Sequence, residues 1–164
     1  MSGHTSAIHD AAWSPDGALV ASCGQDRSVR LWQASSGAEL MRIDGHAEIV
    51  WSVAISPDGA LLASSDRAGW LRLWDPRSGA PLGAVREGER GHACLEFSRD
   101  GRWLAAGGGE GTVRVWSVAA LRAGGSPRSQ LALAGHADGV QDLAFSPDGT
   151  LLASVSFDRH LRLW

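Results

Sequence analysis

The chain contains no lysine, no asparagine and no tyrosine, and all 15 of its basic residues are arginine. The codons of the three missing residues are A/T-rich, whereas those of Ala, Gly and Arg are G/C-rich. We therefore attribute the unusual composition to codon bias before chemistry. The composition predicts a gene from a high-GC genome, most simply a bacterial one.

Other scarce features each exclude a class of protein. Two cysteines, Cys23 and Cys94, are too few for a disulfide scaffold, and we expect both to be reduced thiols. No apolar run approaches the roughly 18 residues of a membrane-spanning helix, and residues 1–5 lack the basic and apolar segments of a signal peptide. The net charge of −3 gives no reason to expect a nucleic-acid partner. Together these absences predict a cytoplasmic protein without a membrane partner.

What the sequence does contain is a fourfold internal repeat. The tetrapeptide Ser-Pro-Asp-Gly, once with Arg in place of Pro, recurs at intervals of 42, 42 and 48 residues. A phrase of apolar residue, Arg, apolar residue and Trp recurs at the same intervals, and a histidine after Gly lies ten residues before three of the turns. The turns begin at Ser14, Ser56, Ser98 and Ser146, the phrases end at Trp32, Trp74, Trp116 and Trp164, and the histidines are His4, His46 and His136.

Each of the first three units is predicted to form four antiparallel strands, and the last unit three. In the second unit, residues 50–56, 61–64, 70–74 and 81–85 are β-prone or alternate apolar and polar residues. In the Ser-Pro-Asp-Gly turn, Pro fixes its own φ, Asp caps the turn and Gly adopts a left-handed conformation. Four strands in about 42 residues are typical of one β-propeller blade. The sequence therefore predicts an all-β fold of four blades, with approximate boundaries 1–43, 44–86, 87–133 and 134–164.

The combination of Gly-His, Ser-Pro-Asp-Gly and terminal Trp resembles the WD-repeat β-propellers over essentially the whole chain. The name-giving Trp-Asp pair occurs only at Trp74-Asp75. The resemblance implies that His, Ser, Asp and Trp form a hydrogen-bonded tetrad within each blade. The matching residues are His4, Ser22, Asp26 and Trp32 in the first unit, His46, Ser64 and Trp74 in the second, and His136, Ser154, Asp158 and Trp164 in the fourth.

The tetrad is expected to be incomplete in two units. Ala68 stands at the Asp position of the second unit. In the third unit, Gly88, Ala106 and Glu110 stand at the His, Ser and Asp positions, and His92 falls four residues late, so we interpret its match as coincidental.

Several motifs admit a chemical interpretation beside a structural one. A linked Ser, His and Asp could be a hydrolase triad, but no Gly-x-Ser-x-Gly elbow is present, and a structural clamp is favoured. The glycines at 107–111 could bind phosphate, but they lack a following Lys and lie between two predicted strands. No metal site or cofactor is predicted, because the remaining histidines lack ligand spacing.

Two further features repeat or interrupt the pattern. Residues 119–128 hold the extra six residues of the third unit, and their Gly, Ser and Pro content predicts a flexible connection. A row of arginines could form an anion-binding ring, although side chains packed between blades with solvated heads are favoured. These arginines are Arg30, Arg72, Arg114 and Arg162.

Four units are fewer than the seven common in the family, which need about 294 residues at about 42 a blade. The last unit has no fourth strand, and only residues 1–3 precede His4 to supply one. The sequence therefore predicts a partial or open propeller that needs its remaining blades or a second copy for ring closure. A segment of a larger propeller is favoured over a half-ring that pairs with a second copy and over a closed four-bladed ring.

The resemblance implies a non-catalytic scaffold for a protein or peptide partner. The alternatives are a regulatory or sensor part of a larger bacterial kinase or ATPase whose catalytic domain lies outside this chain, and an enzymatic or ligand-binding propeller. Family partners contact positions three and five residues after the histidine and one before the aspartate. Large aromatic and Arg side chains dominate interfaces, although Trp51 and Phe157 could instead be packed between blades. The candidate partner-binding residues are Trp51, Arg67, Phe157, His9, Gln25, Ile49 and Gln141.

Overall fold

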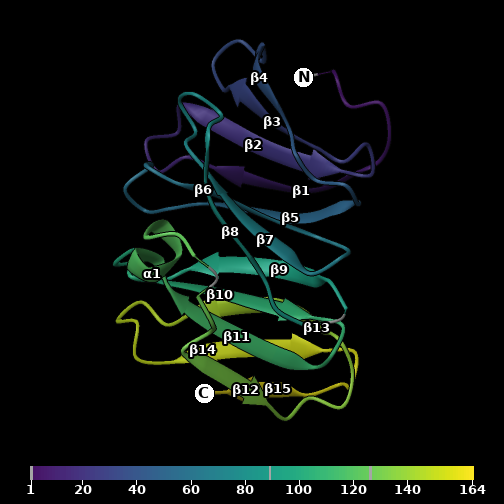
Figure 1. The fold of residues 1–164 in the computed structure, drawn as a ribbon, viewed down its shortest axis with the longest axis vertical. Helices are drawn as coiled ribbons and strands as arrows, with labels where there is room; N and C mark the ends of the chain where they lie inside the picture. The colour runs from purple at the N-terminus through teal and green to yellow at the C-terminus, as the bar shows by residue number, and fades with distance from the viewer. Residues whose placement is uncertain (1, 89, 126) are drawn as a thin grey trace.

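The computed structural model describes residues 2–88, 90–125 and 127–164, with the exception of the His92 side chain. Within these residues, 15 strands form four separate antiparallel sheets. The sheets follow one another along the long axis, so that the N- and C-termini lie at opposite ends of the molecule (Figure 1). The predicted all-β fold of propeller blades is confirmed, and the ring formed by these blades is not closed.

Each sheet is a meander in which strands adjacent in the chain pair with each other. Three sheets have four strands and the last has three, so each sheet has the topology of one propeller blade. The strands of the first and second blades are β1 (Ile8–Trp13), β2 (Leu19–Gly24), β3 (Ser28–Gln33), β4 (Glu39–Asp44), β5 (Val50–Ile55), β6 (Leu62–Asp66), β7 (Trp70–Trp74) and β8 (Pro81–Arg86), and those of the third and fourth are β9 (His92–Phe97), β10 (Trp103–Gly108), β11 (Thr112–Ser117), β12 (Leu131–Ala134), β13 (Val140–Phe145), β14 (Leu152–Ser156) and β15 (Leu161–Leu163).

The Ser-Pro-Asp-Gly turns join the first and second strands of each blade as predicted. The Ser14 hydroxyl donates to the Asp16 carboxylate at 2.6 Å, and the same carboxylate oxygen accepts the Ala18 amide at 3.0 Å. Gly17 has a φ of 70°, a left-handed conformation that glycine adopts without steric cost. The serine-to-aspartate hydrogen bond and the left-handed glycine recur in all four turns.

The hydrophobic core consists of three clusters, one between each pair of neighbouring blades. Apolar side chains from the second and third strands of one blade pack against the first and second strands of the next blade. This packing stacks the blades. The main contributors are Val29, Leu31, Val50, Leu62 and Trp74 between the first and second blades, Leu71, Leu73, Leu95, Leu104 and Trp116 between the second and third, and Val113, Val115, Val140, Leu143 and Leu152 between the third and fourth.

The segment predicted as a flexible connection, 119–128, instead begins as a short helix. Helix α1 (Val118–Arg122) starts at Ser117, whose hydroxyl accepts the Ala120 amide at 3.4 Å. Val118 and Leu121 are buried in the cluster between the second and third blades, so apolar packing orders the first part of the insertion. The later part includes Ser126, which lies outside the described residues.

Both cysteines are free and buried, which confirms the expected thiols. Burial raises the pKa of the Cys23 thiol far above its usual range, and that of Cys94 to about 12. These thiols therefore act as small apolar core groups near neutral pH. In the glycine-rich run 107–111, Gly107 and Gly108 end β10, and residues 109–111 form the turn before β11, which confirms the predicted strand-to-strand turn.

Candidate functional site

Four side chains of the first blade form a continuous hydrogen-bond chain. The Trp32 indole N–H donates to Ser22 Oγ at 2.7 Å, and the Ser22 hydroxyl donates to His4 Nε2 at 2.8 Å. The Nδ1–H of His4 donates to the Asp26 carboxylate at 2.9 Å. We assign this tautomer because it gives every polar group in the chain a partner.

The fourth blade repeats this chain with nearly the same geometry. The Trp164 indole and His136 Nε2 lie 2.9 and 2.8 Å from Ser154 Oγ, and His136 Nδ1 lies 2.9 Å from Asp158. Burial opposes ionisation of Asp158, but hydrogen bonds from the Ala137 amide and from His136 outweigh it and hold the pKa of this carboxyl well below its usual range.

The prediction that the second blade lacks the tetrad aspartate is wrong. Asp66, two residues before Ala68, lies 2.8 Å from His46 Nδ1 and completes the chain to Ser64 and Trp74. Asp66 is the last residue of β6 and is buried. The Asp66 carboxylate contacts the histidine from the end of a strand. In the other two tetrads, the aspartate contacts its histidine from the turn that follows the strand.

Backbone donors support the displaced carboxylate. Asp66 Oδ1 accepts the amides of Ala68 and Trp70 at 2.9 and 3.0 Å. Burial alone would raise the pKa of Asp66, but these bonds and the one from His46 lower it below its usual value. The signal in the sequence was an acidic residue within the same strand-to-strand segment, two positions early.

Among the side chains that the structure describes, the third blade shows no such chain. Ala106 is buried in the apolar cluster, and Glu110 pairs with Arg114 at 3.0 Å. The Arg90 amide also donates to Glu110, at 3.3 Å. His92 begins β9, but its side chain lies outside the described residues, so the interpretation of its match as coincidental stays a prediction.

The geometry of the tetrad does not favour a hydrolase. Ser22, Ser64 and Ser154 are buried, and each hydroxyl oxygen already accepts an indole N–H. A catalytic serine must reach substrate and needs an adjacent oxyanion site. The tetrad is therefore a buried link that ties the third strand of a blade to the segment before its first strand.

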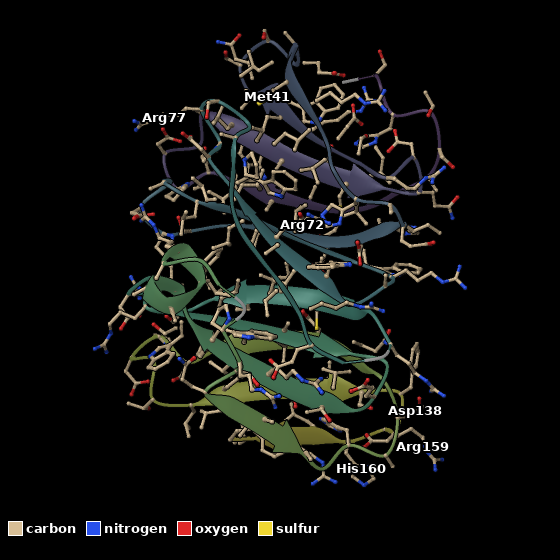
Figure 2. All side chains as sticks on the ribbon, viewed as in Figure 1. Met41, Arg72, Arg77, Asp138, Arg159 and His160 are labelled. Atoms are coloured by element: carbon tan, nitrogen blue, oxygen red, sulfur yellow. The ribbon has the colours of Figure 1, made fainter. Side chains whose placement is uncertain are left out.

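Three arginines of the row have a partner side chain. The Arg30 guanidinium lies 2.6 Å from Glu39 and 3.3 Å from Asp26 and is buried, so the predicted solvated head is wrong there. Arg114 pairs with Glu110, and Arg72, which is labelled in Figure 2, lies 5.0 Å from the centre of the Trp70 ring. Each of these three heads is therefore matched by an anion or an aromatic face.

The four inner strands, β1, β5, β9 and β13, lie side by side and line a cleft of about 510 Å³. Three of the predicted partner-binding residues line it: His9, Trp51 and Gln141. The rings of His9 and Trp51 stack with centroids 4.3 Å apart and a tilt of 37°. Trp51 is half-buried, so part of its side chain is accessible to solvent.

The other predicted contact residues lie away from this cleft. Gln25 and Arg67 are exposed in the turns that follow β2 and β6, and Phe157 is exposed after β14. Ile49 is half-buried just before β5. Their binding role stays a prediction.

Three carboxylates in the cleft were not predicted from the sequence: Asp10, Glu96 and Asp142. Among the described lining residues there is no arginine, so the cleft is acidic. Burial and the negative charge of Asp142 raise the pKa of Glu96. An alignment of the four units at the position held by Asp10 and Asp142 could have revealed two of these residues. Within the part of the chain that the structure describes, no cluster of His, Cys, Asp or Glu could hold a metal ion.

Comparison with known proteins identifies related sequences. The Ixodes scapularis "Probable cytosolic iron-sulfur protein assembly protein CIAO1 homolog" is 42% identical over 38 residues, which are 23% of this chain and 12% of that protein. "Protein Mut11" of Chlamydomonas reinhardtii is 50% identical over 40 residues, 24% of this chain and 11% of that protein. The Arabidopsis thaliana "Transcriptional corepressor LEUNIG_HOMOLOG" is 54% identical over 35 residues, 21% of this chain and 4% of that protein.

Each match thus spans about one repeat and about a tenth or less of the length of these curated relatives. The named relatives are eukaryotic, so they lend no support to the bacterial origin or to the signalling enzyme expected as an alternative, and both stay predictions. The family comparison covers far more of the chain. The sequence matches the family described as "WD domain, G-beta repeat" over residues 1–33, 37–75, 86–117 and 127–164, and the chain therefore belongs to that family.

Proposed function

We propose that this chain is a non-catalytic scaffold that binds a protein or peptide partner in the cleft of its four inner strands. Membership of the WD-repeat family supports an interaction role. The residues that line the cleft support the cleft as the place where the partner binds. The observation that carries the proposal is the stacked pair of His9 and Trp51, which presents a half-buried aromatic surface inside a cleft of about 510 Å³. Aromatic anchors in concave sites supply much of the binding energy of protein interfaces.

The charge of the cleft points to a partner segment with a basic side chain. Asp10 is engaged by the second blade, but Glu96 and Asp142 present carboxylates on the neighbouring strands. An Arg or Lys of the partner could contact the Trp51 ring through a cation–π interaction and pair with Glu96. The same acidic lining opposes a nucleic-acid phosphate backbone.

A cytoplasmic location fits this proposal. The name of the Ixodes scapularis relative describes that protein as cytosolic. Within residues 2–88, 90–125 and 127–164, no helix is both long and apolar enough to cross a membrane. The location of this chain stays a prediction.

The experiment is to select binders from a random peptide display library against the full 164-residue chain, and then to measure their Kd. We expect selected peptides to be rich in Arg or Lys together with aromatic residues. Trp51→Ala should weaken their binding about tenfold or more, which corresponds to about 1.4 kcal/mol. Glu96→Gln should weaken binding and reduce its dependence on salt.

The matched control is Leu40→Ala, which removes an exposed apolar side chain from the outer strand β4. It should leave the Kd unchanged. Peptides that bind Trp51→Ala as tightly as the unchanged chain would place the binding surface elsewhere and contradict the proposal.

A further inference from the structure

The third blade departs from the other blades at positions that lie together in the structure. Arg102 and Trp103 stand where the other blades have a small residue followed by leucine. The third blade also follows its third strand with helix α1, whereas the first and second blades use a short turn there. Residues that the blades share explain the common fold, so these departures require another explanation. The residues equivalent to Arg102 and Trp103 are Ala18 and Leu19, Ala60 and Leu61, and Thr150 and Leu151.

Helix α1 is a fixed part of the fold at the edge of the molecule, where it contacts β8 and β11 (Figure 1). The Val118 amide donates to the Arg102 carbonyl at 2.9 Å, and Leu121 is buried between the second and third blades. A Cβ at Gly83 of β8 would lie 2.6 Å from the Leu121 carbonyl oxygen, so glycine at this position allows the helix to approach the strand. The equivalent residues of β4 and β12 are Met41 and Leu131.

Between α1 and the turn that joins β9 to β10 lies a hollow of about 520 Å³, which we call the α1 hollow. Trp103, Val118 and Ala119 supply its apolar part. Arg102 and Arg122 supply its charge. Among the described residues that line the hollow there is no Asp or Glu, so it is basic, whereas the cleft of the inner strands is acidic.

The two guanidinium groups of the α1 hollow are weakly engaged by the protein itself. In the described part of the chain, the head of the exposed Arg102 bonds only Asp100, through Nε at 2.5 Å. Arg122 is exposed and has no hydrogen bond or ion pair among the described residues. The pKa of Asp58 is lowered mainly by the Ser56 hydroxyl and to a smaller extent by the charge of Arg122. Because exposed ion pairs contribute little, both heads can bind a ligand without losing a strong contact.

Packing within the blade does not account for these side chains. Trp103 packs against the cluster between the third and fourth blades but is half-buried, and the other blades fold with leucine at this position. Arg102 and Arg122 lie outside the core. Trp and Arg are the side chains most enriched among residues that dominate binding energies at protein interfaces. An indole beside two accessible guanidinium groups in a concave surface therefore indicates a binding site.

We propose that the α1 hollow binds an acidic peptide segment of a partner protein. Asp or Glu carboxylates of the segment pair with Arg122 and with the terminal nitrogens of Arg102, and an apolar side chain of the segment packs against Trp103. A nucleic-acid backbone is a poorer match, because Asp100 and Asp58 lie near the two arginines and the chain has a net charge of −3. The hollow shares no lining residue with the cleft, so the inference does not depend on the partner proposed there.

The test selects peptides from a display library enriched in acidic and apolar residues, with the full 164-residue chain as target. Peptides that also bind a variant with both Arg102→Ala and Trp103→Leu are removed. These substitutions restore the residues of the second blade, so we expect the variant to stay folded, which circular dichroism checks. We expect peptides in which acidic residues flank an apolar one. A selection that recovers no acidic peptide would overturn the proposal.

Arg122→Ala is the independent test, because Arg122 is unchanged in the variant used to remove peptides. It should raise the Kd of the selected peptides about tenfold or more, and replacing their Asp and Glu by Asn and Gln should have a similar effect. Added sodium chloride should also weaken binding. The matched control is Arg77→Ala, which removes an exposed arginine of the turn after β7, labelled in Figure 2, and should leave the Kd unchanged. Peptides that bind Arg122→Ala as tightly as the unchanged chain would overturn the proposal.

Two further measurements separate this site from other occupants and from the cleft. Trp51→Ala should leave the affinity for the acidic peptides unchanged, and a tenfold loss there would place these peptides in the cleft and contradict the proposal. A short single-stranded RNA should not compete with the peptides. RNA that displaces them, and whose own binding is weakened by Arg122→Ala, would identify nucleic acid as the occupant and overturn the proposal.

Discussion

The Asp66 carboxylate lies 2.8 Å from His46 Nδ1, although the equivalent aspartate position of that blade is held by Ala68. Within the described residues, the first, second and fourth blades therefore carry the complete hydrogen-bond chain of Trp, Ser, His and Asp. The histidine requires a carboxylate within hydrogen-bond distance of its Nδ1. The aspartate that supplies this carboxylate can lie two positions earlier in the sequence.

Asp66→Ala should lower the free energy of unfolding by about 1–3 kcal/mol, because it leaves the buried Nδ1–H of His46 and two backbone amides without their acceptor. Urea unfolding measures the change. Glu48→Ala, an exposed acidic residue just before β5, is the control and should stay within about 0.5 kcal/mol of the unchanged chain. A similar small effect for both would show that the tetrad of this blade contributes little.

Acidification should destabilise the fold through the same carboxylates. The pKa values of Asp26 and Asp66 lie below the ordinary aspartate value of 3.8, so the unfolded chain takes up protons before the folded one does. The resulting stabilisation is complete above about pH 5 and decreases as the pH falls through 3.8 towards the lower folded-state values.

Asp66→Asn isolates one carboxylate in this pH dependence. The difference in unfolding free energy between this variant and the unchanged chain should shrink as the pH is lowered from 7 to about 3, because protonation removes the same charge. Urea melts at several pH values measure it. A difference that is constant with pH would contradict the lowered pKa of Asp66.

Arg159→Gly should stabilise the chain by about 0.5–1 kcal/mol, since a residue with a side chain is strained in a left-handed conformation. Arg159 has a φ of 72° and lies in the turn at the C-terminal end of the molecule (Figure 2). The equivalent positions of the second and third blades hold Gly69 and Gly111, with φ of 83° and 71°. Thermal melts measure the gain, and Arg67→Gly, outside the left-handed region, should give none.

Trp51→Ala and Trp74→Ala should differ sharply in their effect on stability. Trp74 is buried between two blades and bonds Ser64, so its loss should cost about 3–5 kcal/mol. Trp51 is half-buried, so its loss should cost less than about 1.5 kcal/mol. Equal losses in urea unfolding would mean that Trp51 belongs to the core and is a poor candidate for partner binding.

The repeat predicted the architecture because each blade is a local structure. Equal spacing of Ser-Pro-Asp-Gly and of Trp32, Trp74 and their equivalents locates the turns and strands without any knowledge of how the blades pack. His9 and Trp51 were selected differently, from the contact positions that the resemblance to the WD-repeat family implies, and the structure brings their rings together.

The errors arose where a side chain is defined by contacts between segments. Asp66 was missed because alignment by position ignores a carboxylate that reaches the same atom from the strand end. Arg30 was expected in solvent, but Glu39 of the neighbouring strand provides a buried partner. Helix α1 is ordered by Leu121 packing between two blades, and the acidic cleft exists because four inner strands converge. None of these contacts follows from the spacing of the repeat motifs alone.

The most direct test of the account is hydrogen exchange of the full chain with and without a peptide selected for binding. The account predicts slower exchange along β1, β5, β9 and β13, strongest around Trp51, and no change in the outer strands β4, β8 and β12. Protection confined to the outer strands, or to the exposed turns that hold Gln25, Arg67 and Phe157, would contradict a partner site in the cleft.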